Sequence, residues 1–128
     1  MKDRRSDAHR SQCPIAATLD FIGDKWSLIV VRDMVVKKHK YREFLESPEG
    51  IPTNILAARL KSLEEKGIIR KRPYQTKPLR YEYMLTQRGA DLLPVLQQLA
   101  AWGYKHIPGR WQPPAWFFAA RPGDLLNS

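Results

Sequence analysis

The residue best suited to covalent chemistry is the single cysteine, Cys13, which precedes Pro14 at the expected start of a helix. The positive end of the helix dipole and the nearby Arg10 favour a thiolate there. One cysteine cannot form a bridge within the chain. The redox products open to it are therefore a Cys13–Cys13 bridge between two subunits and an adduct with a small thiol or electrophile. A half-buried structural cysteine is the alternative role.

The other residue types predict no catalytic or metal centre. The three histidines, His9, His39 and His106, lie in unrelated segments, and with one cysteine they give no metal-binding spacing. The chain contains no phosphate-cradling glycine loop, and no serine stands in a nucleophile elbow. We therefore expect a protein that is not an enzyme and uses no cofactor or metal. A thiol-dependent peroxidase or transferase acting through Cys13 is the enzymatic alternative.

Positive charge is concentrated in one segment. The chain has 22 basic and 13 acidic residues, a formal net charge of +9, and twelve of the basic but only five of the acidic residues lie between Lys37 and Arg80. Such a concentration favours one interpretation, a surface that binds the phosphate groups of nucleic acid. The other interpretation, basic residues that are merely solvated, suits lysines scattered along the chain. An anionic membrane surface would attract the same charge, but the segment order described below favours duplex DNA.

Length and composition limit the remaining possibilities. With 128 residues, of which 43% are hydrophobic, the chain fits one domain with a real core. The apolar run at 28–31 is far shorter than the ~20 residues of a membrane-spanning helix. Residues 1–10 are charged and resemble no secretory signal. We expect a cytoplasmic, bacterial protein that is bound to the nucleoid when active and does not associate with membranes.

Apolar periodicity predicts mainly helices with one β-hairpin. Asp24, Thr53 and Thr86 are expected to cap the second, fourth and last helices. The expected order is helices over 14–22, 24–36, 41–46 and 53–66, strands over 68–72 and 80–85 joined by a loop at 75–79, and one long helix from 86 to about 103. This order is typical of a winged helix-turn-helix, in which the hairpin is the wing. Residues 1–12 are expected to form a flexible basic arm, 13–106 the domain, and 107–128 an aromatic and proline-rich extension.

The helix over 53–66 has the pattern of a DNA recognition helix. Leu56, Leu60 and Leu63 form one apolar stripe that must face the core. The opposite side presents Asn54, Ala58, Lys61, Ser62 and Glu65, with Ala57 on one flank and Thr53 at the N-terminus of the helix. The residues expected to contact base edges or phosphate are Thr53, Asn54, Ala57, Ala58 and Lys61. An ordinary amphipathic surface helix would show the same alternation.

The hairpin and its flanks carry the expected phosphate contacts. The candidates are Lys71, Arg72, Lys77 and Arg80 in the wing, together with Lys40 and Arg42 ahead of the third helix. Arg59 lies beside the apolar stripe. A pair with Glu43 or Glu46 is at least as good an expectation for it as a DNA contact.

The sequence resembles the HxlR-type bacterial transcription regulators, which are related in fold to MarR-type regulators. The likeness covers about 13–103 and rests on the order and spacing of several segments. They are CPI at 13–15, IGDKWSLI at 22–29, YREF at 41–44, IPTNILAARLKSLE at 51–64, YEYMLT at 81–86 followed by Gly89, and LAAWG at 99–103.

The resemblance implies a homodimer that binds a pseudo-palindromic operator, with dimerisation through the first and last helices. It places the recognition helix at 53–61 and the wing at 71–80, with half-sites ~34–36 Å apart or a multiple of that distance. Repression is the commoner mode in the family, and its redox-responsive members carry their sensing cysteine at the position of Cys13. A small molecule or an oxidant is the implied effector. The alternative function is a winged helix that binds protein or RNA.

The extension at 107–128 goes beyond the usual end of the family. It contains Trp111, Trp116, Phe117 and Phe118 among prolines. Because so many aromatic side chains are unfavourable in water, we expect the extension to pack on its own domain or across a dimer. A lid over a ligand pocket and a partner-binding segment are the alternatives.

Overall fold

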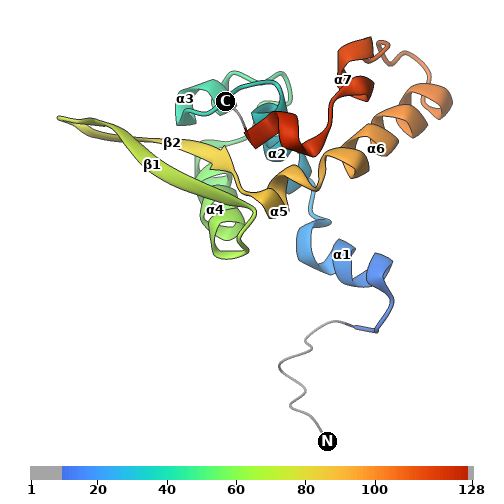
Figure 1. Ribbon diagram of the computed structural model, residues 1–128, viewed down its shortest axis with the longest axis horizontal. Coiled ribbons are helices and arrows are strands. Elements are labelled where there is room, and N and C mark those ends of the chain that lie inside the picture. Colours follow the sequence, from blue (N-terminus) through green and yellow to red (C-terminus); the bar gives the residue numbers. More distant parts are fainter. Residues whose placement is uncertain (1–9, 127–128) are drawn as a thin grey trace, which may run out of the picture.

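The computed structural model describes residues 10–126, so most of the arm expected at 1–12 lies outside the described residues. Figure 1 shows the hairpin projecting from one end of the molecule, α6 and α7 forming the other end, and α1 standing away from the rest. The elements are α1 (Pro14–Ile22), α2 (Ser27–Val35), α3 (Tyr41–Leu45), α4 (Thr53–Glu65), β1 (Ile69–Thr76), β2 (Leu79–Leu85), α5 (Gln87–Ala90), α6 (Leu93–His106), α7 (Ala115–Ala119) and a 3-10 helix (Pro122–Leu126). The mainly helical fold with a two-stranded antiparallel hairpin confirms the predicted class.

The core forms where α2, α3 and α4 meet the base of the hairpin. Val30 and Val31 of α2 are buried, as expected for the central helix, and Phe44 of α3 is completely enclosed. Leu56, Leu60 and Leu63 of α4 are also buried, which confirms the apolar stripe. Within the described residues, no helix is both long enough and apolar enough to span a bilayer.

Asp24 was predicted as the N-cap of the second helix, but α2 begins later, at Ser27, and Trp26 is its N-cap. The Asp24 side chain still binds the beginning of this helix. Its carboxylate accepts the N–H groups of Trp26 and Ser27, each at 3.0 Å, and the Ser27 hydroxyl at 2.5 Å. Partial burial raises the pKa of Asp24, but these hydrogen bonds outweigh it and hold the pKa below its ordinary value. These bonds therefore hold the beginning of the central helix.

Two further helix expectations were wrong. Thr53 is the first residue of α4 and Pro52 is the cap, so the Thr53 hydroxyl makes no capping bond. Thr86 does accept the Gly89 N–H, but it caps only the short α5, and the expected single helix is broken before α6. Pro94 explains the break, because proline lacks an N–H and its ring clashes with the carbonyl four residues earlier.

The hairpin is longer than predicted. Pairs continue out to Thr76 and Leu79, so the loop expected at 75–79 shrinks to two residues. The register shifts between Pro73 and Gln75, which leaves Tyr74 without a partner in the ladder. Proline cannot donate to a strand partner, and bulges are where sheets accommodate it.

The C-terminal extension packs partly on its own domain. Phe117 and Leu125 join the core, and Gln97 of α6 donates its Nε2–H to the carbonyls of Phe117 and Ala120, at 2.9 Å each. Trp111, by contrast, is 77% exposed. The extension therefore covers the domain with a few side chains and leaves most of its aromatic surface outside.

Candidate nucleic-acid interface

The outer face of α4 is open to solvent. Asn54, Ala57, Ala58 and Lys61 are all exposed, opposite the buried leucines. Thr53 is exposed too, and because its hydroxyl caps nothing, it is available to a phosphate. The predicted recognition residues therefore share one accessible surface.

Tyr41, at the start of α3, fixes the beginning of α4. Its hydroxyl donates to the Thr53 carbonyl at 2.8 Å. The bond ties the two helices of the motif together at the end where base contacts are expected. Sequence reasoning gave Tyr41 no role, because the pairing joins residues whose proximity only the folded turn reveals.

A buried polar network holds the turn between α3 and α4 against α2. Asp33 is 3% exposed and accepts the Ser47 hydroxyl at 2.6 Å and an Arg32 guanidinium N–H at 2.7 Å. Lys38 donates to Ser47, and Arg32 pairs with Glu49 at 2.6 Å, which lowers the pKa of Glu49. The signal in the sequence was an aspartate inside an apolar helix, since a charge is buried only with partners.

The hairpin is anchored by the segment just before α3. The Tyr83 N–H donates to the His39 carbonyl at 2.7 Å. The backbones of Lys40 and Glu82 also pair in an isolated antiparallel β-bridge. Glu43 secures this segment, because its carboxylate accepts the N–H groups of His39 and Lys40 at 2.8 and 2.9 Å. These two bonds lower the pKa of Glu43. The wing is therefore positioned relative to the start of α3.

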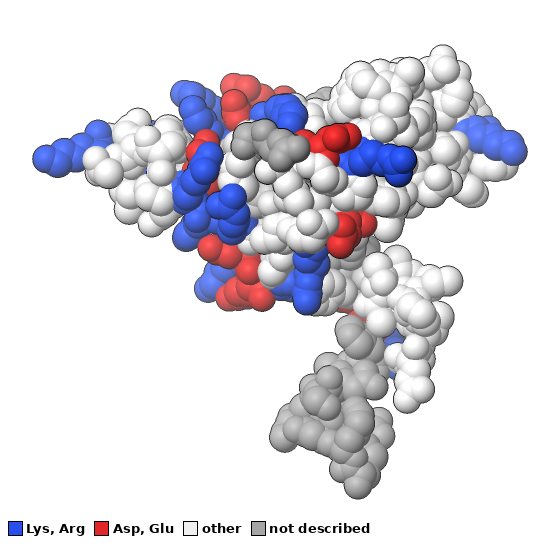
Figure 2. All heavy atoms as spheres, in the orientation of Figure 1, with Lys and Arg blue, Asp and Glu red and all other residues white. Residues whose placement is uncertain are grey.

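The cations predicted to contact phosphate fall into two groups. Two of them have acidic neighbours, since Arg72 pairs with Glu82 at 2.7 Å and Lys71 lies 4.0 Å from Glu64. The others form no ion pair within residues 10–126; they are Lys40, Arg42, Lys61, Lys77 and Arg80. Figure 2 shows the basic side chains gathered over the hairpin end of the molecule. This second group is the more available for an anionic partner.

The sequence suggested that Arg59 pairs with Glu43 or Glu46, but the structure shows neither pair. The Arg59 guanidinium lies 3.8 Å from Asp24, the residue whose side chain binds the beginning of α2. The Arg59 side chain thus lies on the side of α4 that faces the α1–α2 junction. Arg59 therefore links α4 to that junction.

Cys13 is an exposed free thiol at the N-terminal cap of α1. Arg10, expected to favour its thiolate, donates its Nε–H to Asp20 at 2.9 Å. The Arg10 guanidinium is thus paired with the carboxylate of Asp20. Exposure of the thiol keeps it accessible to other reagents.

A second surface consists of apolar side chains on α1 and α6. Ile15 and Leu19 lie four residues apart on α1 and are 72% and 58% exposed. On α6, Val95, Leu99 and Trp102 follow at helical spacing and are 41%, 53% and 61% exposed. In Figure 2 this end of the molecule is mostly free of charged side chains. Exposed apolar side chains that gather on one face of a helix, as they do on each of these two helices, mark a contact site.

Comparison with known proteins gives consistent matches. The model of the HxlR-like helix-turn-helix family matches residues 21–110. The HTH-type transcriptional regulator YdeP of Bacillus subtilis is 35% identical over 94 residues, which is 73% of each chain. A regulator of this type from Synechocystis, sll1512, is 38% identical over 66% of this chain and 62% of its own.

Solved structures agree with this match. PA1607, a candidate transcription factor, is 37% identical, with a TM-score of 0.72 over 81% of this chain and 73% of its own. The redox regulator HypR in its oxidised form is 35% identical, with a TM-score of 0.67 over 73% of this chain and 97% of its own. The helices and the hairpin described above are thus those of winged-helix transcription factors.

Proposed function

The chain belongs to the HxlR-like helix-turn-helix family of transcription regulators, and from that premise we propose that it is a homodimeric repressor of a pseudo-palindromic operator. Its relatives are regulators and not enzymes, and the fold is a DNA-binding one. We place its site of action on the chromosome, in the cytoplasm. We keep the proposed division into a domain at 13–106 and an extension at 107–128; the family match over 21–110 lies mainly within that domain.

One observation carries the DNA proposal. The exposed face of α4 lies beside a hairpin whose tip and return strand carry cations that form no ion pair within residues 10–126. In protein–DNA complexes, phosphate contacts supply most of the affinity and orientation, and base-edge contacts supply the specificity. We assign affinity to Lys77, Arg80, Lys40 and Arg42. Specificity comes from the first turns of α4, with Asn54 suited to an adenine edge.

The proposed dimer uses the apolar faces of α1 and α6. Exposed leucine, isoleucine and tryptophan at this spacing are stabilised by burial against a second copy. A two-fold symmetric pair presents two α4 helices, which is why the operator is expected to contain two half-sites separated by about one DNA turn, ~34–36 Å, or a multiple of it.

We further propose that Cys13 responds to oxidants or electrophiles. The thiol is exposed at the start of α1, a helix assigned to the dimer, and the 35% identical HypR is a redox regulator. In a Cys13–Cys13 bridge, two thiols lose two protons and two electrons to the oxidant and form one S–S bond. Capture of a small thiol or electrophile by Cys13 is the other open route. Diamide treatment followed by non-reducing electrophoresis and mass spectrometry distinguishes them, with Cys13→Ser as the control.

Selection of duplexes from a random-sequence pool tests the DNA function. The account predicts enrichment of an inverted repeat with two similar half-sites. Enrichment of single half-sites would refute the proposed dimeric arrangement. Failure to enrich any duplex, together with capture of a protein or single-stranded RNA, would instead support a winged helix with a different partner.

A further inference from the structure

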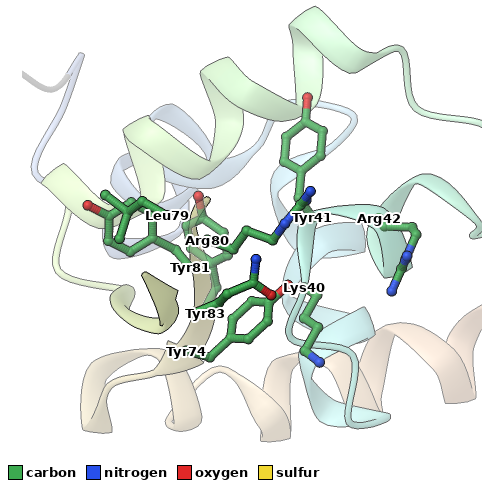
Figure 3. Close-up of a pocket in the computed structure, with 9 residues that line it drawn as sticks. Lys40, Tyr41, Arg42, Tyr74, Leu79, Arg80, Tyr81 and Tyr83 are labelled. Carbon is green, nitrogen blue, oxygen red and sulfur yellow. The ribbon is translucent and has the colours of Figure 1, made fainter. Parts of the chain in front are cut away.

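A groove of about 700 Å³ separates the hairpin from the beginning of α3 (Figure 3). One wall consists of residues 40–42 and the other of side chains from β1 and β2. Of the nine residues that line it, four are tyrosines, three are basic and none is acidic. Figure 3 shows Arg80 directed toward Tyr41, Lys40 lying against Tyr74, and Arg42 at the outer edge.

Phosphate binding by DNA accounts for only part of this lining. Lys40, Arg42 and Arg80 suit a phosphodiester backbone. Three of the tyrosines have partners outside the groove, since Tyr41 bonds to the Thr53 carbonyl, Tyr81 lies under the Lys71 ammonium group and Tyr83 packs edge-on against Phe44. The ring of Tyr74 has no such partner, and a backbone makes no use of it. A duplex keeps its bases stacked in the helix and presents phosphate, sugar and base edges to a protein. Tyrosine faces stack on flat, exposed rings. B-form DNA would therefore engage the basic side chains of the groove but not its exposed aromatic ring.

The position of Tyr74 strengthens this argument. It is the residue that the register shift leaves out of the ladder, and it remains 39% exposed. The Lys40 ammonium nitrogen lies 4.4 Å from the centre of its ring. An aromatic face and a positive charge thus meet in the groove at a point where the hairpin makes no pairing of its own.

We propose that this groove is an effector site for a small, planar aromatic anion that carries a carboxylate or a phosphate. The ring would lie against Tyr74 and the anionic group would pair with Lys40 and Arg80. The volume falls within the range of small-molecule sites, roughly 300–1,000 Å³. Because the same cations serve the proposed DNA surface, a bound anion competes with the operator. This regulatory consequence, unlike the binding itself, rests on the proposed function.

Calorimetric titration of the full-length protein tests the binding. The probes are 1-naphthoate, which is an aromatic carboxylate, and adenosine monophosphate, which is an aromatic phosphate. Two control probes follow: neutral 1-naphthalenemethanol has the aromatic ring without the charge, and inorganic phosphate has the charge without the ring. We expect at least one of the aromatic anions to bind about tenfold more tightly than either control probe. Naphthoate binding identifies a carboxylate class, and nucleotide binding a phosphate class. No binding by either probe, or equal binding of inorganic phosphate, would overturn the proposal.

Substitutions locate the site. Tyr74→Ala and Arg80→Gln are expected to weaken binding of the aromatic anion by about tenfold each. Trp111→Ala and Arg110→Gln change exposed residues of the same chemistry in the C-terminal extension and are the matched controls. Thermal unfolding verifies that each variant is folded. If the groove variants and the control variants bind alike, the site is not this groove.

A DNA titration separates the two proposals. Aromatic anion at about ten times its dissociation constant is expected to weaken operator binding by wild-type protein about tenfold, and the Tyr74→Ala variant to lose most of that response. An anion that binds without altering operator affinity would refute the competition. Anion binding by a protein that selects no duplex would leave the site standing and refute the DNA function instead.

Discussion

Two surfaces of the molecule are exposed: one is formed by the hairpin and α4, and the other by the apolar faces of α1 and α6. Contact with water is favourable only for the first. Lysine and arginine side chains of the hairpin are well solvated, and their charge keeps copies of the protein apart until an anion neutralises it. On α1 and α6, by contrast, burial of the exposed apolar side chains out of water lowers the free energy; these are Ile15, Leu19, Leu99 and Trp102. The molecule therefore has one surface suited to an anionic partner and another suited to an apolar partner.

The two surfaces are also supported differently. The hairpin is tied to the domain by the Tyr83–His39 hydrogen bond and by Glu43, and α4 packs its leucines into the core. In α1, Ile22 is the buried residue, and Lys66 of the α4 end reaches the Phe21 carbonyl. The charged surface is built on elements packed into the core, whereas α1 buries only Ile22 within its own chain, which is the arrangement that the proposed dimer would complete.

The largest expected effect comes from placing a charge on the apolar surface. Leu99→Glu should weaken the dimer at least ~100-fold, because an unpaired carboxylate would be buried at the interface. Sedimentation velocity over a concentration series measures this change. Leu79→Glu makes the same substitution at an exposed leucine of the hairpin and should leave the dimer intact. A Leu99→Glu protein that sediments like the wild type would remove α6 from the interface.

The next effect sharpens the role of the charged end. Asn54→Ala should relax the preference for one base pair in each half-site, a loss of about 1–3 kcal/mol in discrimination. Repeating the selection from random duplexes with this variant measures it, and Gln112→Ala in the extension is the amide control. An unchanged selected consensus would exclude Asn54 from base recognition.

A smaller effect separates affinity from specificity. Lys77→Ala should weaken binding to all duplexes alike and reduce the slope of log affinity against log salt by about 1, because one phosphate contact is lost. Titrations at several salt concentrations give the slope, with Lys105→Ala on α6 as the control. A changed base preference with an unaltered slope would contradict the assignment.

The smallest effect concerns the base on which the hairpin stands. Glu43→Gln should cost about 1 kcal/mol of stability at pH 7, since two backbone N–H groups lose a charged acceptor. The pKa of Glu43 is lowered in the folded protein, so its contribution is present above the ordinary glutamate pKa and is lost as pH falls through the folded value. Urea unfolding of both proteins at pH 7 and pH 3 should show the gap closing. An equal gap at both pH values would rule out this origin.

Local patterns were enough to predict the first four helices, the presence of the hairpin and the exposed face of α4. The spacing of Leu56, Leu60 and Leu63 identifies the buried face, and Asp24 lies three residues before the start of α2. Pro94 and the pairing of Gln75 with Arg80 show the limit of this approach. One breaks a helix that its flanking residues would support, and the other extends strands into turn-like sequence.

Long-range contacts were the part that sequence could not supply. The bond from Tyr41 to the Thr53 carbonyl, the contact of Arg59 with Asp24 and the groove beside Tyr74 each join segments that periodicity treats separately. Charge alone could not distinguish Arg72, which pairs with Glu82, from Lys77, because that difference depends on the strand register.

The central claim is that two copies of α4, joined through the apolar surface, recognise two half-sites. Fluorescence anisotropy with three duplexes tests it most directly, at physiological salt and with reductant: the selected operator, the operator with one half-site scrambled, and a fully scrambled duplex. The account predicts affinity for the operator about 10³-fold or more above that for the scrambled duplex, with most of the preference lost when one half-site is scrambled. Equal affinity for all three duplexes would contradict it.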